Sequence, residues 1–440
     1  MRIRRWAALA AAPLLLSTLP AAEAAAPTIR VDRAPVVISG AATGITAAVD
    51  VDTDPSGRIY VLTPDAVRVF APGARGNATP VRSVSLGFAA TRSAARLAVD
   101  EAGWIYVISR DGGVDPEVTV VRPAAATPPV TYAAGDLGLG TPLDLTAVGS
   151  QVAIVDNDSN AVEFYDLRSG DTVRERYLAA GSDTATQIFE PQAIDADPAG
   201  RIVLSGRNWV SVFAAGADST NTPGLAPQRY LAGSRTGLGS DADRYTTGVG
   251  LDRRGAIVVG TTEFYVLPDT LEPRFRNQRI LAFAPGATGN ATPTAVLAGT
   301  RSGLGDLSGL DLGPTGSLVT NRADMATQAY TAAVSVHRPL GPYTAPARVT
   351  GLKVSGGKKA ARRTVSWRPA VANSDVPVRS YAVRVTCAGS VKLARTIPAG
   401  RRAATVALGR TKRATCTVKV TASNAIGVGP VASTTFRVKR

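Results

Sequence analysis

The chain has 440 residues, of which 45% are hydrophobic, 19% are charged and only 5% are aromatic. With 43 glycines and 29 prolines, this composition favours short strands joined by turns. It argues against a coiled coil, a disordered acidic chain and a protein with several membrane spans.

The first 24 residues have the pattern of an export signal. A basic start, Met1–Arg5, precedes an apolar stretch, Trp6–Pro20, which is shorter than the roughly 20 residues that a membrane span needs. Ala22-Glu23-Ala24 fits the small-x-small cleavage rule. We therefore expect cleavage after Ala24, no transmembrane segment, and a secreted protein that can associate with the cell envelope.

A hairpin pattern recurs six times between residues 48 and 319. Each copy has an alternating apolar strand, a polar turn that ends in glycine, and a second apolar strand, as in residues 48–62. Four copies carry aspartate three residues before the turn glycine. Because aspartate can cap its own turn and glycine tolerates positive φ, this Asp-x-x-Gly segment predicts a tight hairpin. The turn glycines are Gly57, Gly103, Gly149, Gly200, Gly255 and Gly316.

Further strands complete each repeat. In the first copy, residues 67–70 and 81–84 follow the hairpin and flank the turn decapeptide 71–80, which recurs almost unchanged at 284–293. Units of four strands at this spacing are typical of propeller blades. The D-x-x-G-x-I-Y-V and A-P-G-A-x-G-N-A-T-P motifs resemble NHL-type repeats of bacterial six-bladed β-propellers. The resemblance covers residues 34–342 and implies an all-β fold with six radial sheets.

The ends of this predicted ring are expected to pair. Residues 36–44 resemble the ends of later repeats but precede the first hairpin, and the last repeat lacks a fourth strand after His337. We predict that Pro35–Ser39 supplies the missing strand, because pairing of the termini removes exposed sheet edges.

Charge marks a second domain. Residues 345–440 contain 20 Lys and Arg and one acidic residue, Asp375, for a formal charge of +19, whereas residues 27–344 carry −6. All seven lysines lie in this last stretch. Such a sharp change in composition predicts a domain boundary near Pro342–Pro346.

Seven short alternating runs in residues 346–440 predict an immunoglobulin-like β-sandwich. Their order, with Trp367 in the second run, Tyr381 in the third and the block Val418–Pro430, resembles a fibronectin type III domain. The resemblance places Cys387 and Cys416 on neighbouring strands. In an exported chain a disulfide is the simplest interpretation, and two buried free thiols are the alternative.

Catalytic groups are sparse, and we predict no catalytic residue, no cofactor and no metal ligand. A Ser-His-Asp triad would need His337, the only histidine, for which a strand-end position is favoured. Asp156–Asn160 lacks the glycine and distal glutamate of a calcium loop, so a β-turn is favoured. Five aspartates near inner-strand ends are interpreted as turn caps rather than an acidic funnel: Asp50, Asp100, Asp195, Asp252 and Asp311.

The basic domain gives the main functional hypothesis. Its clustered cations predict attraction to an anionic polymer, such as a wall polymer, an acidic polysaccharide or extracellular nucleic acid, with solvated surface charge as the alternative. The residues are Lys358, Lys359, Arg362, Arg363, Arg401, Arg402, Arg410, Lys412 and Arg413. We expect an exported, non-catalytic binding protein whose propeller presents a face to a protein or carbohydrate ligand. The competing interpretations are a propeller hydrolase or lyase with a metal at the central axis, and a structural spacer. No oligomeric state is predicted.

Overall fold

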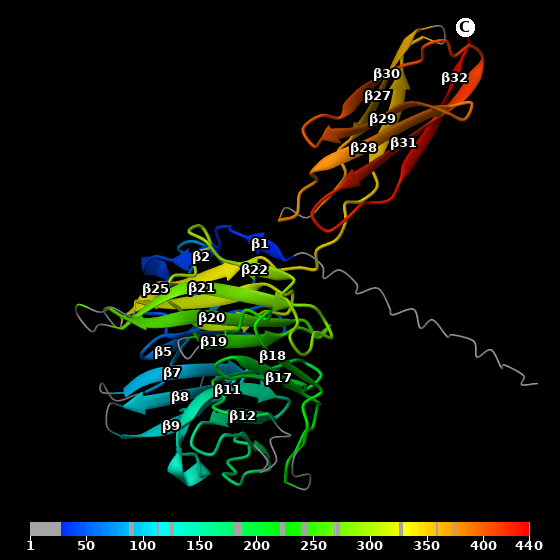
Figure 1. Ribbon diagram of the computed structural model, residues 1–440. Coiled ribbons are helices and arrows are strands. Elements are labelled where there is room, and N and C mark those ends of the chain that lie inside the picture. The colour runs from blue at the N-terminus through cyan, green and yellow to red at the C-terminus, as the bar shows by residue number, and fades with distance from the viewer. Residues whose placement is uncertain are drawn as a thin grey trace, which may run out of the picture.

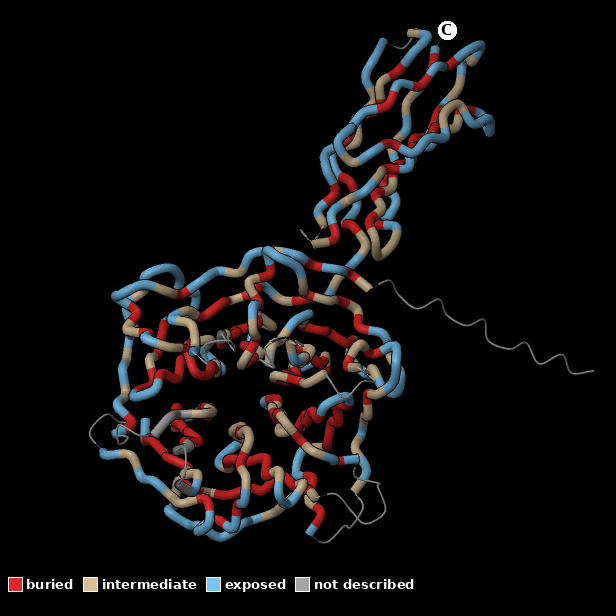
Figure 2. The backbone as a smooth tube through the Cα atoms, turned by 60° about the vertical axis from the view of Figure 1, so that its left-hand side comes forward, coloured by how far each residue is buried: buried red, intermediate tan, exposed pale blue. Residues whose placement is uncertain are grey.

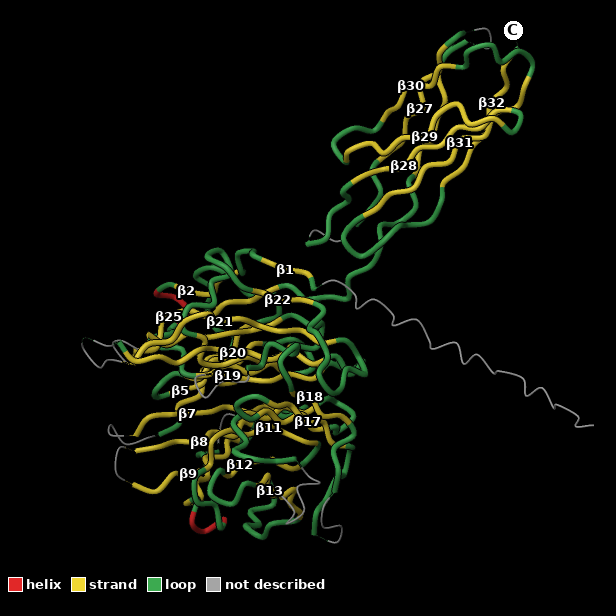
Figure 3. The backbone as a smooth tube through the Cα atoms, in the orientation of Figure 1, coloured by secondary structure: helices red, strands yellow, loops and turns green. Residues whose placement is uncertain are grey.

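The computed structural model describes residues 28–87, 92–111, 114–123, 127–179, 187–220, 225–239, 244–267, 269, 273–324, 329–357, 360–372 and 375–439. The predicted export signal, residues 1–24, lies outside these residues. The described chain is all-β, and its only helices are two single 3₁₀ turns, η1 (Ala41–Thr43) and η2 (Gly135–Leu137) (Figure 3). In this part of the chain we find no helix with the length and hydropathy that a membrane crossing requires.

Strands β1 to β25 form six sheets, each built mainly from four strands that follow one another in the chain (Figure 1). The first sheet contains β3 (Asp50–Thr53), β4 (Ile59–Leu62), β5 (Ala66–Phe70) and β6 (Arg82–Ser85). The second contains β7 (Arg92–Val99), β8 (Ile105–Asp111), β9 (Val114–Val121) and β10 (Val130–Ala133). The third contains β11 (Pro142–Val148), β12 (Gln151–Asp156), β13 (Ala161–Tyr165) and β14 (Arg176–Ala179).

The other three sheets continue the pattern, and the N-terminal segment contributes to two of them. The fourth contains β15 (Ala193–Ala196), β16 (Ile202–Ser205), β17 (Trp209–Phe213) and β18 (Arg229–Ala232). The fifth contains β19 (Arg244–Leu251), β20 (Ile257–Val266), β21 (Pro273–Phe283), β22 (Ala295–Leu297) and the added strand β1 (Ile29–Val31). The sixth contains β23 (Leu307–Leu312), β24 (Leu318–Asp324), β25 (Ala329–His337) and β2 (Val36–Ser39).

The six sheets are arranged around a common axis, and we call this body the six-sheet ring (Figure 2). The innermost strands β3, β7, β11, β15, β19 and β23 contact one another in this order, and β23 also contacts β3. Middle strands such as β4 and β16 are buried along their whole length. Strands of a sheet that is covered on both faces have a continuous apolar sequence, as residues Ile59–Leu62 do. The core therefore consists of apolar layers between neighbouring sheets.

The hairpin turns have the conformation that the Asp-x-x-Gly motif predicts. Asp54 accepts hydrogen bonds from the backbone N–H groups of Ser56 and Arg58, both at 3.0 Å. Gly57 closes the turn at a φ of 81°, where a side chain would be strained. Although burial alone would raise the pKa of Asp54, hydrogen bonds from the Ser56 hydroxyl, the Arg58 guanidinium and the Arg58 N–H lower it. The carboxylate is thus held ionised within the turn.

The N-terminal segment joins the last sheet as the sequence predicts. β2 pairs antiparallel with β25, from Val36 opposite Val336 to Ser39 opposite Ala333. The strand β1 was not anticipated. It pairs parallel to β22 at the edge of the fifth sheet and precedes residue 34, the predicted start of the first domain. Its three residues, Ile29-Arg-Val31, have no counterpart in the other repeats, so no internal comparison reveals them.

Seven more strands form a two-sheet sandwich. One sheet contains β26 (Thr350–Ser355), β27 (Arg362–Arg368) and β30 (Ala403–Ala407), and the other contains β29 (Ser390–Pro398), β28 (Ser380–Cys387), β31 (Ala414–Ser423) and β32 (Ala432–Val438). All seven predicted runs are strands. Trp367 and Tyr381 pack edge to face in the core, with ring centroids 5.3 Å apart. Cys387 lies opposite Cys416 on β28 and β31, and the two form the predicted disulfide.

Candidate functional site

Four aspartates occupy equivalent positions on the inner strands and line a channel along the axis of the ring. Each lies five residues before the turn glycine of its repeat, and each accepts a hydrogen bond from the next sheet around the ring. Each bond ties one sheet to the following one. Asp52 accepts from the Val99 N–H at 2.5 Å, and Asp144 accepts from the Ile194 N–H at 3.0 Å. Asp195 accepts from the Leu251 N–H at 2.9 Å, and Asp311 accepts from the Thr53 hydroxyl at 2.6 Å.

Burial and mutual repulsion favour protonation of these channel aspartates. Desolvation raises the pKa of Asp144 to about 7 and that of Asp311 to about 6, from a usual 3.8. Desolvation and the charge of Asp311 together raise the pKa of Asp52 and of Asp195 well above the usual value. Carboxyl groups that share a confined space cannot all ionise cheaply. These carboxyl groups are therefore protonated more readily than exposed aspartates.

Arg96 occupies the middle of the channel between two carboxylates. Its guanidinium lies 3.6 Å from Asp144, and the charges of Asp50 and Asp144 raise its pKa even though burial alone would lower it. Asp50 also accepts a hydrogen bond from the Leu97 N–H at 2.9 Å. This cluster divides the channel into two parts, each of which has its own mouth.

The five aspartates interpreted as turn caps divide into two groups. Asp100 and Asp252 are caps, since they accept hydrogen bonds from the backbone N–H groups of Trp104 and Ala256. Asp50, Asp195 and Asp311 instead line the channel, so the turn-cap interpretation is wrong for them. Asp52 and Asp144 were missed. Spacing would have found them, because caps lie three residues before the turn glycine, whereas Asp52 and Asp144 lie five before it, as Asp195 and Asp311 do.

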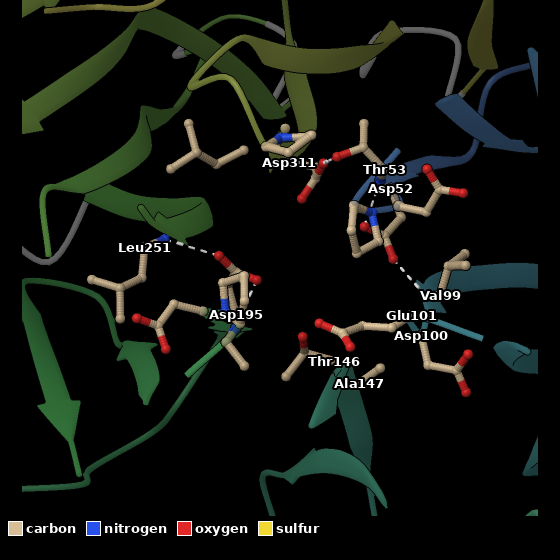
Figure 4. Close-up of a pocket in the computed structure, with 18 of the residues that line it drawn as sticks. Asp52, Thr53, Val99, Asp100, Glu101, Thr146, Ala147, Asp195, Leu251 and Asp311 are labelled. Carbon is tan, nitrogen blue, oxygen red and sulfur yellow. Dashed lines mark hydrogen bonds between the residues drawn. The ribbon is translucent and has the colours of Figure 1, made fainter. Parts of the chain in front are cut away.

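The narrow mouth opens on the side of the Asp-x-x-Gly turns and has a volume of about 180 Å³. Figure 4 shows Asp52 and Asp311 near each other, with Asp195 across the opening. Among the described residues, no group of three or more His, Cys, Asp or Glu side chains has the spacing to hold a metal ion. The described residues therefore provide no set of metal ligands that would support the hypothesis of a metal-centred enzyme.

The wide mouth, at the other end of the channel, is a cavity of about 710 Å³. We call it the wide cavity. Three half-buried aromatic side chains from the fifth sheet form one wall, and Tyr330 from the sixth sheet also lines it. Tyr245 and Phe264 contact edge to face with centroids 6.2 Å apart, and Phe264 and Phe275 do so at 5.6 Å. Such geometry is a favourable arrangement of aromatic pairs.

Two further predicted positions have structural roles. His337 ends β25 and is buried, with its Nε2 atom 3.1 Å from the Thr320 hydroxyl. Burial, and the nearby charge of Arg33, lower its pKa to about 4. Asp156–Asn160 connects β12 to β13 as a turn, in which Asp156 accepts a hydrogen bond from the Thr141 N–H at 2.7 Å.

The basic residues named from the sequence do not form one patch. Lys358 and Lys359 lie outside the described residues. Arg362 begins β27 opposite Ala407, the last residue of β30. The segment that follows β30 carries Arg410, Lys412 and Arg413, so these residues share the end of the sandwich with Arg362.

The remaining predicted cations lie elsewhere on the sandwich. Arg401 and Arg402 precede β30 and therefore lie at the opposite end from Arg362. Arg363 is buried, with its guanidinium 5.7 Å from the Phe436 ring centroid. Arg363 is therefore a packing residue rather than a surface contact, and the predicted set is wrong in including it as an accessible cation.

A basic sheet face was missed. Arg384 on β28 lies directly opposite Lys419 on β31, and both side chains are exposed. Arg437 is exposed on the neighbouring strand β32. Like charges directly opposite each other destabilise a sheet. No carboxylate is available to offset them here, because the sandwich has a single acidic residue, Asp375, which pairs with Arg33 of the ring. We call Arg384, Lys419 and Arg437 the basic face.

Comparisons with known proteins do not assign the chain to a family. No protein-family model matches it, and no curated protein matches its sequence. Among solved structures, it is similar to the extracellular domain of a hybrid two-component system from B. thetaiotaomicron, at 9% identity and a TM-score of 0.37. That match covers 89% of this chain and 50% of the other, so this chain spans about half of that protein's length.

Smaller structures match about a fifth of the chain. A protein named FN3tt is similar at 14% identity and a TM-score of 0.18, over 22% of this chain and 100% of the other. A redesigned β-sandwich protein is similar at 18% identity and a TM-score of 0.19, over 21% of this chain and 94% of the other. Likenesses at these scores assign neither a family nor a function.

Proposed function

We propose that the chain is an exported, non-catalytic binding protein in which a six-bladed NHL-like β-propeller, residues 34–342, presents a ligand site. A fibronectin type III module, residues 346–440, holds the protein against an anionic polymer of the cell envelope. The signal in residues 1–24 directs export. The disulfide supports an oxidising compartment outside the cytosol, where such bonds persist.

The unbalanced charge of the sandwich carries this proposal. Its formal charge is +19, and its one carboxylate, Asp375, is 7% exposed and paired with Arg33. The surface cations thus have no acidic partner within the module, and their field extends into the solvent. A surface of this kind attracts polyanions over a distance of about 10 Å at 0.1 M salt.

The chemistry of the basic face favours a polysaccharide or wall polymer over nucleic acid. Single-stranded nucleic acid is held by exposed aromatic rings on which bases stack. The sandwich buries Trp367 and Tyr381, and Phe436 is partly buried beneath Arg363. Threonines accompany the cations instead, with Thr386 opposite Thr417 and Thr417 opposite Thr435. Hydroxyl groups and spaced cations suit a chain that carries repeated carboxylate or phosphate groups.

Salt-dependent retention tests the proposal. The mature chain is applied to immobilised heparin and to purified wall teichoic acid, and eluted with sodium chloride. We expect retention at low salt and release as salt rises, because bound counterions compete for the cations. Passage through both matrices at low salt would overturn the proposal.

Two double variants of equal charge locate the contact. Arg384→Gln with Lys419→Gln removes two cations from the basic face. Arg401→Gln with Arg402→Gln removes two cations from the segment between β29 and β30. We expect the first pair to elute at distinctly lower salt than the second. Equal shifts would assign the attraction to overall charge rather than to the basic face.

A further inference from the structure

The wide cavity of the ring has the features of a ligand site that is separate from the basic face. Its volume of about 710 Å³ lies within the range of about 300–1,000 Å³ in which proteins hold small organic ligands. Both apolar walls and polar groups line it, which is the usual composition of such sites. The cavity also receives side chains from five of the six sheets, so it is a product of ring assembly.

The fifth sheet builds the aromatic wall. Its strands β20 and β21 have 10 and 11 residues, and are the longest in the ring. They place Phe264 directly opposite Phe275 in the strand pairing. Tyr245 completes the wall from β19, and Arg207 lies 4.9 Å from its ring centroid. The rings are fixed by one another and by this cation, yet they stay half-buried and available to a ligand.

The charged groups around the cavity already have polar partners. Arg96 is balanced by Asp50 and Asp144, and Asp306 accepts a hydrogen bond from the Gln278 amide at 3.0 Å. Beyond the lining, Arg244 and Arg279 share the carboxylate of Glu263. A charged ligand would have to compete with these existing partners. The cavity therefore favours an uncharged ligand.

Hydroxyl and amide groups on the floor supply hydrogen bonds. Thr246 is oriented by Ser205, at 3.0 Å between the two hydroxyl oxygens, and lies 3.3 Å from the Gln192 amide oxygen. The neighbouring residue Thr247 also lines the cavity, and its buried hydroxyl has no hydrogen-bond partner within the described part of the chain. An unmet buried hydroxyl costs free energy that a ligand hydroxyl can recover.

We propose that the wide cavity binds a neutral oligosaccharide. The face of an aromatic ring carries partial negative charge. It therefore attracts the polarised C–H groups on one side of a pyranose ring. The opposite side of the sugar presents hydroxyl groups toward Thr246 and Thr247. The inference rests on the proposed role of the ring as a ligand scaffold, but it is independent of the anionic-polymer contact of the sandwich.

Calorimetric titration of the mature chain tests this site. The probes are uncharged hexasaccharides of β-1,4-linked glucose, xylose, mannose and N-acetylglucosamine, and of α-1,4-linked glucose. We expect at least one to bind with an affinity that stays constant between 0.05 and 0.5 M sodium chloride, because no ion pair forms. Salt-sensitive binding, or no binding by any of the five at millimolar concentration, would overturn the proposal.

Variants locate the bound sugar. We expect Phe264→Ala to weaken binding at least tenfold, and Thr247→Val, which keeps the shape of the side chain, to weaken it about threefold. Tyr177→Ala is the matched control, because this tyrosine lies on the outer strand β14 and does not line the cavity. Binding that all three variants retain would place the sugar elsewhere and reject this site.

The heparin assay separates the two proposals. Loss of sugar binding in Phe264→Ala with unchanged heparin retention supports the cavity, provided that the melting temperature of the ring shows that the variant folds. A mature chain that binds heparin and none of the sugars rejects the cavity alone.

Discussion

Arg33 and Asp375 form an ion pair that joins the six-sheet ring to the sandwich. Arg33 lies between β1 and β2, and its guanidinium also donates hydrogen bonds to the carbonyl groups of Arg338 and Pro339. The two side chains are only 10% and 7% exposed. Asp375 additionally accepts a weak hydrogen bond from the Tyr343 hydroxyl at 3.5 Å. The single acidic residue of the basic module therefore serves its attachment to the ring.

Loss of this carboxylate should weaken the junction. We expect Asp375→Asn to destabilise the sandwich by about 3 kcal/mol, because it leaves the buried Arg33 charge without its counterion. Calorimetric melting measures the loss, and limited proteolysis between Leu340 and Thr344 should become faster. Glu190→Gln is the control, since the Glu190–Arg207 pair is exposed and worth less than about 1 kcal/mol. Equal effects of the two substitutions would argue against a buried junction.

The N-terminal strands should stabilise the ring as a whole. Removal of residues 25–40 deletes β1 and β2, and with them the buried side chains of Ile29, Val31 and Ile38. At about 2 kcal/mol for each buried aliphatic side chain, we expect the melting temperature of the ring to fall by about 10 °C. The bare edge of β25 should also promote association, which light scattering detects.

A shorter deletion gives the control for this experiment. Removal of residues 25–27 ends ahead of β1 and should leave the melting temperature unchanged. If the longer deletion also melts at the original temperature, pairing of β2 with β25 does not contribute to the stability of the ring.

The disulfide should stabilise the sandwich alone. It closes a segment with a sequence separation of 29, for which the restricted unfolded chain predicts about 3 kcal/mol. Replacement of Cys387 and Cys416 together by alanine should lower the melting temperature of the sandwich by about 15 °C and spare that of the ring. Dithiothreitol should have the same effect on the native chain and none on the variant. A shift confined to the ring would contradict this assignment.

Local sequence patterns predicted the strands but only some of the contacts between distant segments. The Asp-x-x-Gly turns are encoded within a few residues, and Asp54 and Gly57 adopt the geometry that their side chains dictate. The pairing of β2 with β25 followed from the repeat count, because the last repeat lacked one strand. In contrast, the three residues of β1 pair with β22 across more than 260 positions, and nothing in their sequence specifies that partner.

The candidate sites were less predictable for a geometric reason. Arg384 and Lys419 lie 35 positions apart in the chain and meet only through the register of β28 and β31. The clustered arginines, which drew attention in the sequence, fall at opposite ends of the sandwich. The wide cavity likewise depends on Tyr245, Phe264 and Phe275, whose separate places in the chain give no sign that they share one wall.

The raised pKa values of the channel aspartates should make the ring less stable as the pH rises through neutrality. In the folded chain the pKa of Asp144 is about 7 and that of Asp311 about 6, against 3.8 for an exposed aspartate. The folded state therefore binds protons that the unfolded state has released, and this stabilisation is lost as the pH rises through 6 to 7. Between pH 6.5 and 8, Asp144 alone should contribute a loss of about 1 kcal/mol, or about 3 °C.

The buried histidine acts in the opposite sense and in a different range. Because the pKa of His337 is lowered to about 4 from 6.5, its contribution is present above pH 6.5 and is lost as the pH falls toward 4. Melting curves from pH 6.5 to 8 therefore isolate the aspartates. We expect Asp144→Asn to flatten the decline, and Asp171→Asn, at an exposed turn position, to leave it unchanged. A melting temperature that rises toward pH 8 in the native chain would mean that the channel carboxylates are ionised when the ring is folded.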